Sequence, residues 1–174
     1  MSRPHPFRSL PWVALAASCS LTACSSSDDA PHPTAVVLEG AASEAQLATF
    51  LSKEPREWAW AGGQFDAPDK NATLDAGTAL TFAWHADPSD FAQGGAPGEV
   101  VMTHGLRFGS ASNDRLLEVF TTLPEYTPDA MHWQKLVEAS EPITVSLTTC
   151  TFVGTDLPEE GGPFIGQALT FTIE

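Results

Sequence analysis

The chain has 174 residues and is strongly acidic, with 22 Asp and Glu against eight Lys and Arg and a net charge of −14. This balance argues against binding to nucleic acid and against an electrostatic grip on anionic lipid, because both need clustered basic side chains. The length suits one ordinary domain with a short additional segment.

The N-terminal segment is basic and then apolar. Arg3 and Arg8 precede an apolar run over residues 10–21, which is shorter than the ~20 residues that span a bilayer. This order is typical of a secretory signal peptide, here residues 1–23, rather than of a folded element.

The apolar run ends in Leu21-Thr22-Ala23-Cys24. This ending resembles the lipobox of bacterial lipoproteins, which implies cleavage between Ala23 and Cys24 and a covalent lipid on the Cys24 thiol. The lipid is the only cofactor-like group that we expect, and the membrane is the expected partner, because more than one acyl chain gives stable anchoring. Ser25 after the cysteine resembles the sorting signal of familiar Gram-negative lipoproteins and implies the outer membrane of the cell envelope.

Residues 24–35 are polar and proline-bearing, which predicts a flexible tether. Of the three cysteines, Cys19 lies in the leader and Cys24 carries the lipid. Cys150 is then left without a partner in the chain, so no internal disulfide is expected. We interpret Cys150 as a small buried hydrophobic residue, with an intermolecular disulfide or a metal thiolate as the alternatives.

Residues 36–56 predict a short strand and one helix. The strand covers residues 36–38, and Ser43 with Gln46 three residues later matches a capping box. An apolar stripe at helical spacing follows, made of Leu47, Phe50 and Leu51. We expect this helix to end at residues 53–55 and to pack on the rest of the domain.

From residue 57 the pattern changes to the alternation of β-strands. Trp58 and Trp60 alternate with smaller residues, and Leu80, Phe82 and Trp84 share one face of a second strand. A short strand, a glycine turn and Leu-x-Phe-x-Trp resemble the first strands of immunoglobulin-like and fibronectin type III-like modules. That resemblance implies that Trp84 fills the core between two sheets.

Further strands and a second helix follow a loop over residues 87–98. The helix is expected to begin with Thr127 as N-cap and Pro128 at its first position, and the Tyr126 hydroxyl is expected to anchor the turn that follows it. A switch of the buried face at a bulge is expected near Cys150. The expected strands are residues 100–104, 106–108, 116–121, 143–149 and 169–173.

Residues 57–174 are therefore predicted to form a mainly β, antiparallel immunoglobulin-like sandwich, and the whole chain to carry two short helices. The chain also resembles small, uncharacterised Gram-negative lipoproteins that end in a Thr-Phe-Thr-Ile strand. The sequence carries no hydrolase elbow, zinc-protease motif or phosphate-binding glycine loop. We therefore expect a lipid-anchored binding or structural module rather than an enzyme, with a protein or glycan as its unidentified partner.

Two alternatives rest on particular side chains. Met102 and His104 lie on one predicted strand face, and with His132 they offer sulfur and imidazole ligands that suit copper. Trp58 and Trp60 offer aromatic faces on which a sugar could stack, although large aromatic residues more often fill the core of a small sandwich.

Overall fold

The computed structural model describes residues 36–58, 62–86 and 99–174, all of which belong to one compact unit. Within these ranges the chain is mainly β-structure with two α-helices. The predictions for the leader, the lipidated cysteine, the tether, Trp60 and the loop at 87–98 lie outside the described residues. No helix in the described ranges is long and apolar enough to cross a membrane.

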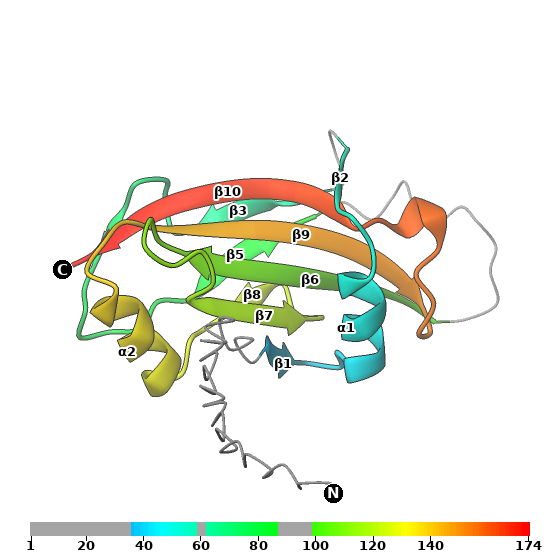
Figure 1. Ribbon diagram of the computed structural model, residues 1–174, viewed down its shortest axis with the longest axis horizontal. Coiled ribbons are helices and arrows are strands. Elements are labelled where there is room, and N and C mark those ends of the chain that lie inside the picture. The colour runs from blue at the N-terminus through cyan, green and yellow to red at the C-terminus, as the bar shows by residue number, and fades with distance from the viewer. Residues whose placement is uncertain (1–35, 59–61, 87–98) are drawn as a thin grey trace, which may run out of the picture. The chain divides into compact units, whose positions relative to one another are not determined.

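The larger sheet, sheet A, has the strand order β1-β7-β6-β9-β10-β2, and β4 also pairs with β10 (Figure 1). Its strands are β1 (Val36–Glu39), β2 (Arg56–Glu57), β4 (Thr73–Leu74), β6 (Val100–Gly109), β7 (Leu117–Thr121), β9 (Ile143–Val153) and β10 (Phe164–Ile173). The central strands pair antiparallel, whereas β1 runs parallel to β7 and both β2 and β4 run parallel to β10. Sheet A is therefore mixed rather than purely antiparallel.

The smaller sheet, sheet B, consists of β3 (Gln64–Ala67), β5 (Phe82–His85) and β8 (Glu125–Tyr126) in an antiparallel arrangement. It lies behind sheet A in Figure 1. We call the face of sheet A toward sheet B the inner face, and the opposite face the outer face. Phe82 and Trp84 of β5 are both buried in the core that joins the sheets, as the sequence predicted for Trp84.

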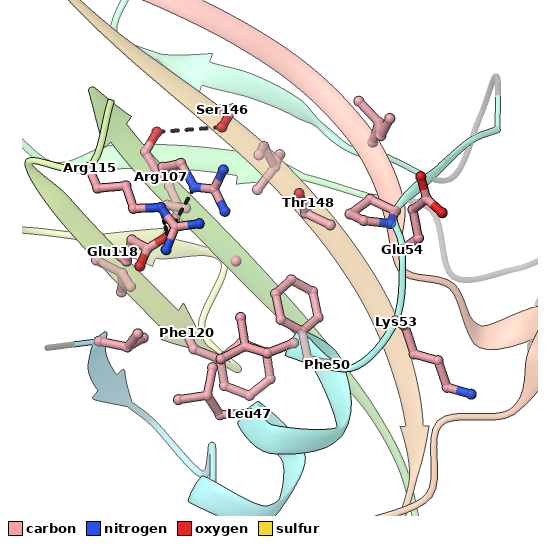
Figure 2. A pocket seen from close by; sticks show the side chains of 18 residues that line it. Leu47, Phe50, Lys53, Glu54, Arg107, Arg115, Glu118, Phe120, Ser146 and Thr148 are labelled. Atoms are coloured by element: carbon pink, nitrogen blue, oxygen red, sulfur yellow. Dashed lines mark hydrogen bonds and ion pairs between the residues drawn. The ribbon is translucent and has the colours of Figure 1, made fainter. Parts of the chain in front are cut away.

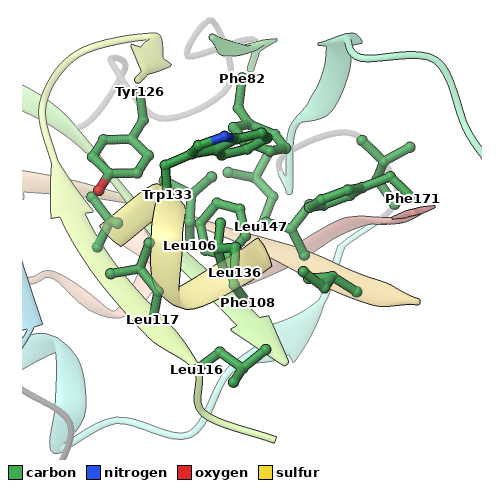
Figure 3. Close-up of a cluster of buried hydrophobic side chains, with 14 of the residues drawn as sticks. Phe82, Leu106, Phe108, Leu116, Leu117, Tyr126, Trp133, Leu136, Leu147 and Phe171 are labelled. Carbon is green, nitrogen blue, oxygen red and sulfur yellow. The ribbon is translucent and has the colours of Figure 1, made fainter. Parts of the chain in front are cut away.

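This main core is filled by aliphatic and aromatic side chains from both sheets and from α2 (Ala130–Glu138) (Figure 3). The Phe82 ring packs edge-on against Phe108, with 5.0 Å between ring centroids. The Trp133 indole of α2 donates a hydrogen bond to the Ala76 carbonyl at 2.9 Å. The sheet-A members of the core include Leu106, Phe108, Leu117, Val119, Ile143, Val145, Leu147, Leu169 and Phe171.

Helix α1 (Glu44–Leu51) covers part of the outer face. The predicted capping box is confirmed, because the Ser43 side chain accepts from Gln46 N–H and the Gln46 side chain accepts from Ser43 N–H. The Gln46 amide also donates to the Gly154 carbonyl at 3.0 Å, which ties the helix to the end of β9. Leu47 and Phe50 pack on a second, smaller core around Phe120, Cys150 and Phe152.

The second core explains why the predicted bulge near Cys150 is wrong. The pairing of β9 with β6 runs in continuous register from Val153 to Thr144. Thr149 and Thr151 are buried on the inner face, and Cys150 and Phe152 are buried on the outer face under α1. Both faces of the strand end are covered, so the alternation of apolar and polar residues disappears without any change of face.

The beginning of α2 also differs from its prediction. Asp129, not Thr127, is the N-cap, and its carboxylate accepts from His132 N–H at 2.8 Å. The Thr127 hydroxyl instead forms a 2.7 Å hydrogen bond with the Thr81 hydroxyl. The Tyr126 hydroxyl does not anchor the turn: it is buried without a hydrogen-bond partner among the described residues, while its ring packs near Phe108.

Candidate functional site

The outer face of sheet A changes character along its strands. Strand register places side chains in rows that run across β7, β6 and β9. The row containing Thr103 and Cys150 is fully buried, and Cys150 Sγ lies 3.6 Å from the Thr103 carbonyl oxygen. The complete burial of Cys150 confirms the prediction of a small buried side chain. This burial raises the pKa of the Cys150 thiol and keeps the thiol protonated.

The next row lies at the edge of α1 and is partly open. It consists of Phe120, Gly105 and Thr148 on adjacent strands, with Ile165 of β10 opposite Thr148. A Cβ at Gly105 would approach Phe50 Cζ to 2.8 Å, so a larger residue at this position would displace the Phe50 ring. The Phe50 ring therefore lies directly on the backbone of β6, tilted against Phe120 with 5.1 Å between centroids.

The third row is charged. Glu118, Arg107 and Ser146 lie side by side, and Arg107 Nε donates to Glu118 Oε1 at 2.9 Å. Arg115, from the loop before β7, places its Nε 4.0 Å from the same carboxylate oxygen. Two guanidinium groups therefore face one carboxylate at this end of the face.

The two open rows and α1 enclose a groove of about 510 Å³, which we call the α1 groove (Figure 2). Its volume is in the range of small-molecule sites. Leu51, part of the predicted buried stripe of α1, is 59% exposed at its rim. The other principal lining residues are Val36, Leu47, Phe50, Lys53, Glu54, Pro55, Gly105, Arg107, Arg115, Glu118, Phe120, Ser146, Thr148 and Ile165.

A second hollow of about 980 Å³ lies beside Trp58, and we call it the Trp58 cleft. Trp58 is 45% exposed, and its ring contacts the Phe164 ring edge-on at 5.5 Å between centroids and the Arg56 guanidinium at 6.0 Å. The strand predicted around the tryptophans is short, because β2 ends at Glu57. Gln64, His85 and Gln167 supply polar groups to the cleft.

The cleft is shaped by a close crossing of two chain segments. A Cβ on Gly62 would collide with the Ile165 carbonyl, and a Cβ on Gly166 would collide with the Gly62 carbonyl. His85 Nδ1 lies 2.8 Å from Asp66 Oδ1 at the cleft, and both side chains are more than half exposed. Ile165, which is 48% exposed, lines both the Trp58 cleft and the α1 groove.

The proposed copper ligands have different surroundings. Burial lowers the pKa of His104 to about 4, and its Nδ1 lies 3.2 Å from Thr149 Oγ1 with the ring edge-on to Trp84. His132 Nδ1 instead pairs with Asp129 Oδ1 at 3.0 Å on α2. The described ranges contain no cluster of three or more His, Cys, Asp or Glu arranged to hold a metal. The copper site with Met102 stays a prediction, to be tested by metal analysis of the purified protein.

The sequence reasoning did not identify the α1 groove. One sequence feature pointed toward the groove. Leu106 and Phe108 alternate with Gly105 and Arg107, which indicates that the latter two lie on the opposite face of the strand. This alternation could not indicate that Arg115 and Glu118 would join Arg107, because their proximity depends on the pairing of β6 with β7. Neither a family model, nor a curated protein, nor a solved structure matches this chain, so no enzyme family is matched.

Proposed function

We propose that the protein is a lipid-anchored envelope protein whose β-rich domain is a binding module, with the α1 groove as its binding site. The observation that carries the proposal is the partial cover of the outer face. Helix α1 buries one row of sheet A and leaves an apolar hollow with two arginines beside it. Concave, mostly apolar hollows with a few polar groups are typical of ligand-binding sites.

The proposal includes the lipid on Cys24, the outer membrane as location and an immunoglobulin-like sandwich as the fold. The packing of two sheets around Trp84 supports the last of these. No catalytic activity is part of it.

The anchoring half is tested by metabolic labelling with a radioactive fatty acid and by detergent phase partitioning. The natural chain is expected in the detergent phase with label, and the Cys24→Ala chain in the aqueous phase without it. A Cys24→Ala chain that still carries label and partitions with detergent would overturn the anchor.

The binding half is tested with N-phenyl-1-naphthylamine, a neutral apolar dye that fluoresces on leaving water. The full chain carrying Cys24→Ser is used, so that no covalent lipid competes for the groove. Thr148→Trp places an indole on the groove floor and is expected to abolish dye binding. Thr144→Trp is the matched control, because Thr144 is an exposed residue on the same face of β9 that does not line the groove. Equal binding by both variants contradicts the proposed site.

A glycan is the second candidate ligand, and the exposure of Trp58 favours it. The indole is held by Phe164 and Arg56 beside amide and imidazole groups, an arrangement suited to stacking on a sugar ring while hydrogen-bonding its hydroxyls. A glycan array is the test. Trp58→Ala is expected to lose any bound glycan and Trp58→Phe to retain part of the affinity, whereas equal signals from both variants reject stacking on this ring.

A further inference from the structure

The charges of the α1 groove contrast with those of the chain as a whole. The chain has a net charge of −14 and eight Lys and Arg, of which Arg3 and Arg8 precede the described residues. Three of the other six line this one groove: Lys53, Arg107 and Arg115. With Glu54 and Glu118 as the acidic lining residues, the groove is cationic on an anionic protein.

The positive charge is concentrated at one end. Arg107 and Arg115 both approach Glu118, which is only 13% exposed, while their own side chains are about half exposed. The carboxylate holds the two guanidinium groups near each other. Guanidinium groups recognise carboxylates and phosphates through paired N–H donors, so this end suits an anionic group.

The rest of the groove is largely apolar and leads away from the arginines. From Arg107 the groove runs past the Phe50 ring, which covers Gly105, toward Thr148 and Ile165. Leu51 and Ile165 present more than two fifths of their surface to solvent.

We propose that the α1 groove binds an anionic single-chain amphiphile, with its carboxylate or phosphate at Arg107 and Arg115 and its hydrocarbon chain along the Phe50 ring toward Thr148 and Ile165. This inference rests on the proposed function, because it names the ligand class of the same groove. A fatty acid and a lysophospholipid share this chemistry. A charged head group joined to a hydrocarbon chain matches a groove that is cationic at one end and apolar at the other.

The experiment is displacement of the neutral dye from the full Cys24→Ser chain by ligands that share a 14-carbon chain, each below its micelle concentration. Myristate carries a carboxylate, the corresponding lysophosphatidic acid a phosphate, monomyristoylglycerol no charge and tetradecyltrimethylammonium a positive charge. We expect the anionic ligands to displace the dye at about tenfold lower concentration than the neutral one, as charge-assisted hydrogen bonds predict. The cationic ligand is expected to be the weakest.

The Arg107→Gln/Arg115→Gln variant is expected to lose the anionic preference, so that myristate and monomyristoylglycerol displace the dye at similar concentrations. Lys70→Gln/Lys135→Gln is the matched control, because it removes the same charge from two exposed residues outside the groove, and it should keep the preference. The Arg107→Gln/Arg115→Gln variant leaves the Glu118 carboxylate without its two arginine partners. If this variant folds poorly, adding Glu118→Gln removes that carboxylate. Circular dichroism confirms that each variant is folded.

The outcomes separate the two proposals. If the dye does not bind the natural groove, both the binding site and its ligand class are wrong. If the dye binds and Thr148→Trp blocks it, but neutral and anionic ligands compete equally, the groove is a site and the anionic amphiphile is rejected. Stronger displacement by an acidic amphipathic peptide than by myristate also rejects it, in favour of a protein segment. If the anionic class is supported, the ligand that displaces the dye at the lower concentration, myristate or the lysophosphatidic acid, identifies the preferred head group.

Discussion

The two faces of sheet A differ in how completely they are covered. Sheet B and α2 enclose the inner face, where Phe82, Phe108 and Ile143 have no exposed surface. The outer face has only the two turns of α1, which bury Cys150 and Phe152 and leave the next two rows open. The closed face therefore supplies most of the burial that stabilises the fold, and the partly open face supplies the groove.

The largest expected effect comes from opening the closed face. Phe82→Ala should lower the free energy of unfolding by about 3–5 kcal/mol, because it leaves a cavity between the sheets. Phe50→Ala on α1 should cost about 1–2 kcal/mol, because that ring is only partly buried, and it should also weaken dye binding. Urea denaturation measures both. Equal costs would show that the two faces contribute alike to stability.

Protonation provides a smaller test of the closed face. Burial lowers the pKa of His104 to about 4 from an ordinary value of 6.5. The unfolded chain therefore binds this proton first as the pH falls, so the contribution of neutral His104 to stability is complete above pH 6.5 and is lost progressively toward pH 4. The loss is at most about 3 kcal/mol.

The measurement is the free energy of unfolding of the natural chain and His104→Gln, each at pH 7 and pH 4.5. The variant should lose less stability between these values than the natural chain does. His85→Gln changes an exposed histidine on sheet B and should follow the natural chain. A pH dependence shared by all three proteins would mean that His104 protonates with little cost in the folded state.

The smallest effects compare the caps of the two helices. Ser43→Ala and Asp129→Ala each remove a side chain that accepts from a first-turn N–H, and each should cost about 1 kcal/mol. Only Ser43→Ala should also weaken dye binding, because α1 forms the wall of the groove and α2 does not. Dye titration and urea denaturation of both variants decide this, and a loss of dye binding in Asp129→Ala would contradict the separation of the two faces.

Much of the fold followed from local patterns in the sequence. The capping box at Ser43 and the alternation from Ile143 to Leu147 depend on neighbouring residues and were predicted. The burial of Trp84 was implied by the resemblance to immunoglobulin-like modules and is also observed. The parallel pairing of β1 with β7 was not predicted, because it joins residues about 80 positions apart with no signal in either strand. The groove was also missed, because Arg107, Arg115 and Glu118 form a cluster only after β6 has paired with β7.

The N-cap of α2 shows a different limit. Thr127-Pro128-Asp129 contains two residues that can cap a helix, and the local pattern predicted the wrong one. The Thr81 hydroxyl, 46 residues earlier, forms a hydrogen bond with Thr127 and leaves Asp129 to cap. Tertiary contacts selected one of two acceptable local structures.

The pairing of β10 has a consequence for how copies of the protein behave when crowded. An open strand ten residues long at the edge of a sheet is a template for aggregation. Here β2 pairs with Phe164 and Ile165, β4 pairs with Thr172 and Ile173, and the register shifts between Ile165 and Ala168. The opposite edge strand, β1, is only four residues long. Both edges of sheet A are therefore poor templates for the addition of a strand from another molecule. We expect many copies to stay folded and separate at high local density.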